Sequence, residues 1–368
     1  MAGDFCPQFR VASIFEDGHY QSVLGEAKQV ICKADYSIVN LECPITIANP
    51  EEAIKKLGPH LCCSIKGLEA LQWAGFKCVT LANNHFMDYG KKGVENTLKS
   101  CSKYRIDTVG GGLNLHKASN VLYKNIKGNI LAIINCCEHE FSIATENTPG
   151  CSPLNPISIF YAINEARAKA NYILVIVHGG HEHFQLPSPR MVEIYRFFID
   201  AGADAIINHH QHCFSGYEVY NSKPIFYGLG NFCFDGNRSK MKIWNEGYMV
   251  MLDFKSSGVS FELYPYLQCL DKPIIEMLPV NSYDTRLREL NSIIARPAAL
   301  QDAINKYYTS CSRRYSNIFE PIQSRLYLAA KNRGWLPSFV SERNMINAYN
   351  YINCESHRDK VLFYLNQF

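Results

Sequence analysis

The sequence lacks any long apolar run, and no window approaches the eighteen uninterrupted apolar residues that predict a transmembrane helix. Its first ten residues, MAGDFCPQFR, also lack the apolar stretch of a secretory signal. Charge of one sign is scarce too, because the formal net charge is only +3 over 368 residues, and this gives no reason to expect nucleic acid or a membrane surface as a partner. We therefore expect a globular, cytoplasmic protein with no transmembrane segment and no nucleic-acid partner.

The pattern C-x-x-C is absent, although the chain has 15 cysteines. The odd count and the adjacent pairs at 62–63 and 136–137 do not fit a disulfide framework. Because a free cysteine behaves as a small apolar residue, we expect reduced and mostly buried thiols, as in a cytosolic protein. The chain also has no G-x-G-x-x-G and no P-loop lysine, so the triple glycine at 110–112 indicates only a turn.

The chain does contain an alternation of helical and strand patterns, which is typical of α/β proteins. Residues 64–75 carry a helical apolar stripe, residues 77–81 form an apolar strand pattern, and residues 91–104 are helical again. From about residue 282 onward the pattern is helical only. At the other end, residues 5–11 are predicted to be irregular and no strand pattern precedes Asp4. Either the given start omits a first strand, or Asp4 is poorly anchored.

Polar side chains gather where the predicted strands end. His210 and His212 follow an apolar strand at 203–207, and His178 follows another at 172–177. Further strand ends offer Asp4, Glu42, Asn84 and His85. Open α/β sheets place their ligands at the carboxyl ends of strands, and mixed carboxylate, amide and imidazole sets suit two neighbouring divalent ions. If these ends converge, Glu42 is the candidate to bridge two ions, and His85 is free to protonate or stabilise a leaving oxygen.

Each of these residues also has a plainer explanation. A single histidine is more often a packing or surface residue than a ligand. Asn84 could form a turn, and Asp88 could cap the helix that begins near residue 91. His209, the third histidine of its cluster, could be structural and orient its neighbours.

Seven motifs follow one another along the first 265 residues. They are Gly3-Asp4, Asn40-Leu41-Glu42, Ala82-Asn83-Asn84-His85 with Asp88-Tyr89-Gly90, His178-x-Gly180-x-Glu182, Gly202-Ala203-Asp204, His209-His210-x-His212 and Leu229-Gly230-Asn231-Phe232. In this order they resemble the CapA-type capsule and poly-γ-glutamate synthesis proteins, which are similar to the calcineurin-like metallophosphoesterases. In the wider phosphoesterase superfamily a histidine stands where this chain has Cys6, and the CapA type lacks that histidine as well.

The resemblance implies both a fold and a site. The fold is a four-layer α/β/β/α sandwich over residues 1–270, followed by a mainly helical C-terminal extension over residues 271–368. The site holds one or two divalent metal ions, with Mn, Mg, Zn and Fe not distinguished. The implied metal ligands are Asp4, Glu42, Asn84, His178, His210 and His212. The catalytic residues assigned with them are His85 and Asp88, and the substrate-binding residues are Asn40, Glu182, His209 and Asn231.

Two functions are compatible with these residues. The first is a divalent-metal-dependent hydrolase of the phosphoesterase type in capsule or poly-γ-glutamate metabolism, acting on an anionic small molecule or polymer. The second is a non-catalytic accessory protein that holds a polyanionic polymer, or a synthase component, at the same strand-end cleft. The cysteine at position 6 and the short N-terminal segment before Asp4 favour the second.

Overall fold

The computed structural model describes residues 1–236, 242–353, 357, 360–361 and 365. The chain divides into two compact units, Met1–Leu300 and Gln301–Phe368. The sequence predicts that the CapA-like domain ends at residue 270, and this boundary stays a prediction. The first unit continues to Leu300 because a strand at Ile275–Met277 (β16) joins its sheets and a helix at Asp284–Ile294 (α9) packs on it.

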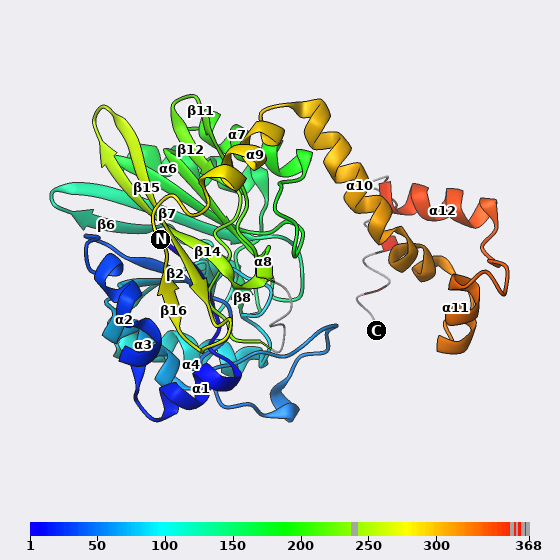
Figure 1. The fold of residues 1–368 in the computed structure, drawn as a ribbon, viewed down its shortest axis with the longest axis horizontal. Coiled ribbons are helices and arrows are strands. Elements are labelled where there is room, and N and C mark those ends of the chain that lie inside the picture. Colours follow the sequence, from blue (N-terminus) through cyan, green and yellow to red (C-terminus); the bar gives the residue numbers. More distant parts are fainter. Residues whose placement is uncertain (237–241, 354–356, 358–359, 362–364, 366–368) are drawn as a thin grey trace. The chain divides into compact units, whose positions relative to one another are not determined.

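The first sheet has five parallel strands in the order β13-β1-β2-β3-β4; its middle strand β2 is labelled in Figure 1. Its strands are Ala2–Phe5 (β1), Ile38–Leu41 (β2), Cys78–Thr80 (β3), Asp107–Val109 (β4) and Asn231–Cys233 (β13). The prediction of an irregular and poorly anchored N-terminus is therefore wrong, because β1 lies between β2 and β13. β1 has too few residues to show the alternation of apolar and polar side chains that predicts a strand. It is a strand because it pairs with β2 and β13, which are distant in the sequence.

The second sheet has six strands in the order β11-β12-β10-β9-β7-β6. Its strands are Leu122–Ile126 (β6), Asn129–Cys137 (β7), Tyr172–His178 (β9), Ala205–His209 (β10), Tyr217–Tyr220 (β11) and Lys223–Phe226 (β12). The four inner strands are parallel, whereas β6 and β11 are antiparallel at the edges. The parallel strands β9 and β10 consequently end at the same sheet edge, with His178 beside His209.

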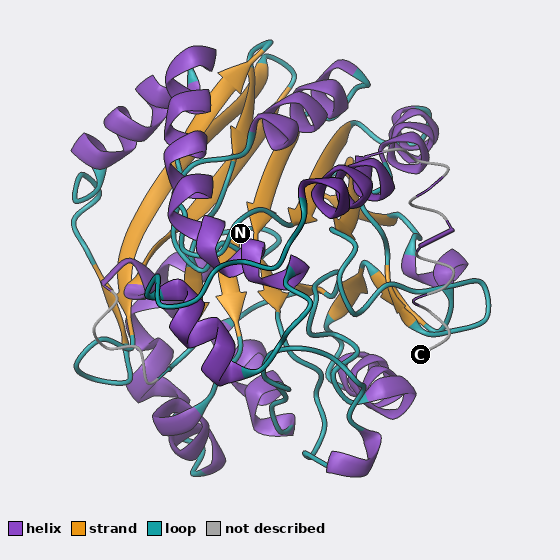
Figure 2. Ribbon diagram, turned by 90° about the vertical axis from the view of Figure 1, so that its right-hand side faces the viewer, coloured by secondary structure: helices purple, strands orange, loops and turns teal. Residues whose placement is uncertain are grey.

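Helices cover the outer faces of both sheets (Figure 2). Those associated with the first sheet are Phe9–Glu16 (α1), Tyr20–Ile31 (α2), Ile65–Ala74 (α3) and Gly90–Lys103 (α4). Those on the second sheet are Pro156–Arg167 (α6) and Pro189–Asp200 (α7). The α3 helix has the predicted ends, because the Ser64 side chain accepts a hydrogen bond from Lys66 N and Gly75 adopts a left-handed φ of 100°. The predicted four-layer α/β/β/α sandwich is confirmed.

A third, antiparallel sheet completes the first unit. Its strands are Glu246–Lys255 (β14), Gly258–Gln268 (β15) and β16. The smaller elements of this unit are Pro50–Glu52 (η1), Gly111–Gly112 (β5), Leu115–Ala118 (α5), Gly150–Cys151 (β8) and Lys242–Asn245 (α8).

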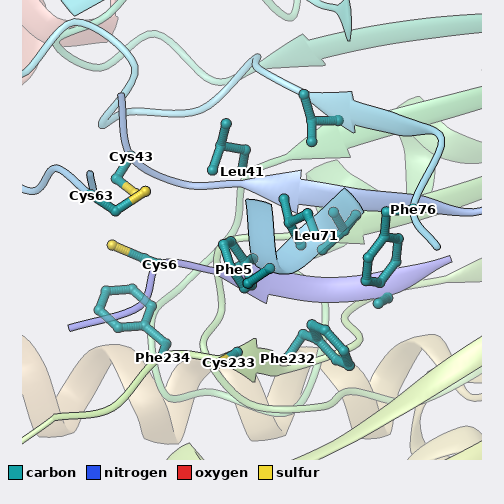
Figure 3. Packing of buried hydrophobic residues seen from close by; sticks show 14 of the residues in the cluster. Phe5, Cys6, Leu41, Cys43, Cys63, Leu71, Phe76, Phe232, Cys233 and Phe234 are labelled. Carbon is teal, nitrogen blue, oxygen red and sulfur yellow. The ribbon is translucent and has the colours of Figure 1, made fainter. Parts of the chain in front are cut away.

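The core between the first sheet and its helices is rich in phenylalanine and cysteine (Figure 3). Phe5 and Cys6 on and after β1 are fully buried, and Phe232 and Cys233 of β13 lie beside them. The 14 cysteines that the structure describes are free thiols, and most are buried, as the sequence predicts. This apolar packing fixes β1, and with it the backbone that carries Asp4.

Between residues 282 and 353 the regular elements are all helices, as predicted. Apart from α9, these helices are Pro297–Ser316 (α10), Asn317–Phe319 (η2), Arg325–Asn332 (α11) and Glu342–Asn353 (α12). Within the described residues, none of the helices is both long and apolar enough to traverse a membrane.

Candidate metal centre

The predicted ligands come together because their strands end at facing sheet edges. Asp4 lies near the end of β1, and Glu42 directly follows β2. On the other sheet, His178 is the last residue of β9, and His210 and His212 follow β10. The sequence alone could not show whether these strand ends lie close together. In the structure they do.

Glu42 is the central group of the cluster. Its Oε1 lies 3.7 Å from His178 Nε2 and 3.5 Å from His212 Nε2. The side chain is completely buried, and within the described residues neither carboxylate oxygen has a hydrogen-bond partner. A buried carboxylate without donors is costly unless a positive charge compensates it.

Two sets of three potential ligand atoms share Glu42. One set is Glu42 with His178 and His210, the other is Glu42 with Asp4 and His212, and the ligand atoms of each set lie within 4.8 Å of one another. Asn84 adds an oxygen, since its Oδ1 is 3.0 Å from His178 Nε2. Carboxylate, amide and imidazole donors around an unpartnered glutamate fit one or two divalent cations, with Glu42 able to contact both.

Three buried residues support these ligand atoms. Asn40 donates from Nδ2 to Asp4 Oδ1 at 2.8 Å, and its Nδ2 also lies 3.3 Å from His178 Nδ1. Asn231 Oδ1 lies 2.9 Å from His212 Nδ1, and His209 Nδ1 lies 3.1 Å from Asp4 Oδ1. These contacts orient the ligands, as the structural role considered for His209 predicts. The predicted substrate contacts of the same three residues stay a prediction.

The histidine loop after β10 has an unusual backbone. His210 and His212 have φ angles of 91° and 52°, a region that non-glycine residues seldom adopt. The neighbouring Asn208 holds this loop in place, because its Nδ2 donates to Gly179 O at 2.8 Å and to Tyr227 O at 3.0 Å. Such strain at two ligand positions, which are separated only by Gln211, is compatible with a functional site.

Burial shifts the pKa values of the cluster. It raises the pKa of Glu42 well above 4.5, with the nearby Asp4 carboxylate adding to the effect. It lowers the pKa of His212 to about 4, and burial together with His210 lowers the pKa of His178 well below 6.5. Burial alone would raise the pKa of Asp4, but the adjacent His209 ring outweighs it and keeps this pKa below its usual range. His178 and His212 thus favour the neutral form, which is the form that binds a metal.

His85 and Asp88 form a pair beside the cluster. His85 Nδ1 lies 2.7 Å from Asp88 Oδ2, and Asp88 is fully buried. The α4 helix begins at Gly90 without any side-chain cap, so the alternative in which Asp88 caps this helix is wrong. The Lys56 ammonium donates to Asp88 Oδ1 and lies 3.1 Å from His85 Nδ1. Sequence reasoning missed Lys56, since no local signal distinguishes it from Lys55.

Glu182, a motif residue, and Cys6, two residues after Asp4, are in different surroundings from the ligands. The Glu182 side chain is 51% exposed, and its Oε2 lies 3.8 Å from His183 Nε2. The predicted substrate contact of Glu182 stays a prediction. Cys6 is buried in the apolar core, where Gln8 Nε2 donates to its sulfur at 3.4 Å. The position two residues after Asp4 therefore provides no imidazole.

Comparison with known proteins shows that this chain is similar to capsule synthesis proteins. A family model described as "Bacterial capsule synthesis protein PGA_cap" matches residues 1–236. The chain is 34% identical over 269 residues to "Capsule biosynthesis protein CapA" of Bacillus anthracis, covering 71% of this chain and 64% of that protein. It is 32% identical over 268 residues to "PGA biosynthesis protein CapA" of Bacillus subtilis, covering 72% and 69%. The chain thus spans about two thirds of the length of these relatives.

More distant similarity extends to other proteins. The chain is 26% identical over 226 residues to "Probable polyglutamine synthesis accessory protein" of Mycobacterium tuberculosis, covering 56% of this chain and 58% of that protein. A solved 5′-nucleotidase precursor from Thermus thermophilus aligns with a TM-score of 0.38 at 12% identity, covering 66% of this chain and 45% of that one.

Proposed function

The chain belongs to the bacterial capsule synthesis protein family PGA_cap, and we propose that it is a divalent-metal-dependent hydrolase of the phosphoester type. Its substrate is an anionic small molecule or polymer of capsule or poly-γ-glutamate metabolism, and synthase components of that metabolism are its candidate protein partners. Its place of action in this proposal is the cytoplasm.

One observation carries the proposal: the Glu42 carboxylate is completely buried, has no hydrogen-bond partner among the described residues, and faces the nitrogens of His178 and His212. A purely structural cluster would supply N–H donors to such a carboxylate. Neutral imidazoles and an unpartnered carboxylate instead leave lone pairs directed at a common space, which is what a cation requires.

Each residue of the cluster has a defined part in this proposal. Asp4, Glu42, Asn84, His178, His210 and His212 hold one or two divalent ions. Such ions, when bound, activate water and polarise the oxygens of a phosphoester. Asp88 holds His85 by its Nδ1, so that Nε2 is the nitrogen left to give a proton to a leaving oxygen or to stabilise its charge.

The test is to measure metal content and turnover of bis(p-nitrophenyl) phosphate with added Mn²⁺ for the wild-type protein and for His210→Ala. We expect one or two equivalents of metal in the wild type, and in the variant a loss of metal with at least a roughly hundredfold fall in turnover. His116 is exposed on α5 and far from the cluster in the chain, so His116→Ala is the matched control and should resemble the wild type. Metal-free wild type, or equal turnover in all three proteins, would refute the hydrolase.

A second candidate is a non-catalytic accessory protein that holds a polyanionic polymer or a synthase component at the same strand ends. Two observations favour it: Cys6 provides no imidazole beside Asp4, and the mycobacterial relative carries the name of an accessory protein. Binding of poly-γ-glutamate by chelator-treated protein, without hydrolysis in the presence of Mn²⁺, is the result that distinguishes this function from the first.

A further inference from the structure

We propose that Lys56 is a positioning residue for His85, because it holds the Asp88 carboxylate against His85 Nδ1 and leaves Nε2 as the nitrogen available to a substrate. The catalytic consequence rests on the proposed hydrolase, whereas the positioning itself rests on geometry alone. The experiment below separates the two.

Lys56 is an ion-paired lysine whose side chain is almost completely buried. Its side chain is only 1% exposed and that of Asp88 is 0% exposed, and the ammonium donates to Asp88 Oδ1. A lysine is seldom fully buried, and a buried ion pair in which one partner is removed leaves an uncompensated charge. This ion pair is shielded from solvent, whereas exposed ion pairs are screened by water and contribute little to stability.

The chain segment around Lys56 donates three hydrogen bonds to Asp88. Ile54 N donates to the Asp88 backbone carbonyl at 3.1 Å, and Leu61 N donates to Asp88 Oδ2 at 2.6 Å. Lys56 takes the other carboxylate oxygen. Oδ2 is thereby directed at His85 Nδ1, 2.7 Å away, and the Lys56 ammonium places a positive charge beside the other carboxylate oxygen.

The two contacts of His85 Nδ1 exclude one another as hydrogen bonds, because a neutral ring nitrogen either donates or accepts. Asp88 Oδ2 at 2.7 Å is closer than Lys56 Nζ at 3.1 Å, and Lys56 already donates to Oδ1. The geometry thus places the proton on Nδ1, donated to Asp88. A carboxylate that holds one ring nitrogen in this way fixes the tautomer and the orientation of the imidazole.

The first test reads the His85 tautomer directly in the full-length protein. Long-range ¹H–¹⁵N correlation spectra of histidine-labelled protein, with the His85 signals assigned by His85→Gln, should show a single tautomer protonated at Nδ1 in the wild type. Lys56→Met should lose this single pattern, Lys56→Arg should restore it, and the neighbouring exposed Lys55→Met is the matched control that should leave it unchanged. An unaltered His85 pattern in Lys56→Met overturns the proposal.

A thermal melt shows whether Lys56→Met folds. If it does not, Lys56→Gln replaces it, because the amide keeps an N–H donor while removing the charge, and the same loss of a single tautomer is expected. Retention of the wild-type pattern in Lys56→Gln would then overturn the positioning role.

The second test measures Mn²⁺-dependent turnover of bis(p-nitrophenyl) phosphate. Lys56→Met should lower kcat by roughly 10- to 100-fold at unchanged KM and unchanged metal content, because a misplaced His85 affects the reaction and not the binding. A loss of metal instead of kcat would assign Lys56 to the support of the ligand loop and overturn the proposal. No turnover in the wild type would refute the hydrolase, while the tautomer measurement would still decide the positioning.

Discussion

At the scale of single residues, Glu42 most clearly separates a metal centre from an ordinary buried cluster. Burial raises its pKa well above 4.5, so the metal-free protein keeps a proton that the unfolded chain has released. The folded state then binds more protons than the unfolded state, and the metal-free protein must lose stability as the pH rises above about 4.5. A bound cation removes this cost because it compensates the carboxylate.

Glu42→Gln should therefore have opposite effects with and without metal. In chelator, the variant should be more stable than the wild type by roughly 1–3 kcal/mol. The reason is that the neutral amide avoids the cost of burying a carboxylate without a cation. This advantage should be larger at pH 8 than at pH 5, following the direction of the Glu42 pKa shift. With excess Mn²⁺ the wild type should gain about 3 kcal/mol at a hundredfold excess over Kd, whereas the variant should gain almost nothing.

Thermal and denaturant unfolding of both proteins in EDTA and in Mn²⁺ measures these four stabilities. The same measurement on Glu289→Gln, at an exposed position of α9, is the control for the charge change alone. A wild type that Mn²⁺ does not stabilise, or a variant that it stabilises equally, contradicts the assignment of Glu42 as a ligand.

At the scale of secondary-structure elements, prediction succeeded where the signal is local. The α3 helix has Ser64 before it and Gly75 after it, and the loops with His178 and His210 follow strongly apolar strands. It failed at β1, whose four residues pair with strands that begin more than 30 and more than 220 positions away in the chain. Lys56 was missed for the same reason, because its carboxylate partner is 32 residues away and belongs to another loop.

The β1–β13 pair gives the element-scale prediction, because Gly3 allows these strands to approach closely. A Cβ atom on Gly3 would lie 1.8 Å from the backbone oxygen of Gly230. We expect Gly3→Ala to destabilise the protein by about 3 kcal/mol or more, and to reduce metal binding because it shifts Asp4. Denaturant unfolding and metal content measure the two effects.

A glycine-to-alanine control is available inside α2. A Cβ on Gly25 would meet only the flexible side chain of Gln21, and alanine is the better helix former, so Gly25→Ala should be neutral or stabilise by up to about 1 kcal/mol. Equal behaviour of the two variants would show that the close approach of β1 to Gly230 does not control the position of Asp4.

At the scale of the whole molecule, the family match and the compact units define different boundaries. The match ends at residue 236, yet β14, β15, β16 and α9 belong to the first unit, which continues to Leu300. All predicted metal ligands, the His85–Asp88 pair and Lys56 lie within this first unit. The fold and the site are therefore properties of residues 1–300, and the helical tail is a separate compact unit.

A chain that ends at Leu300 should accordingly fold and bind the same number of metal equivalents as the full-length protein. Its melting temperature in EDTA should fall by no more than about 5 °C, which corresponds to the loss of roughly 1–2 kcal/mol in a domain of this size. The increase in melting temperature on adding Mn²⁺ should be the same for both chains, because it depends only on the ligands and their supports. Calorimetry and elemental analysis of the two chains side by side provide the measurement. Loss of metal from the shortened chain would mean that residues 301–368 contribute to metal binding. That result would contradict a site built only from strand ends of the first unit.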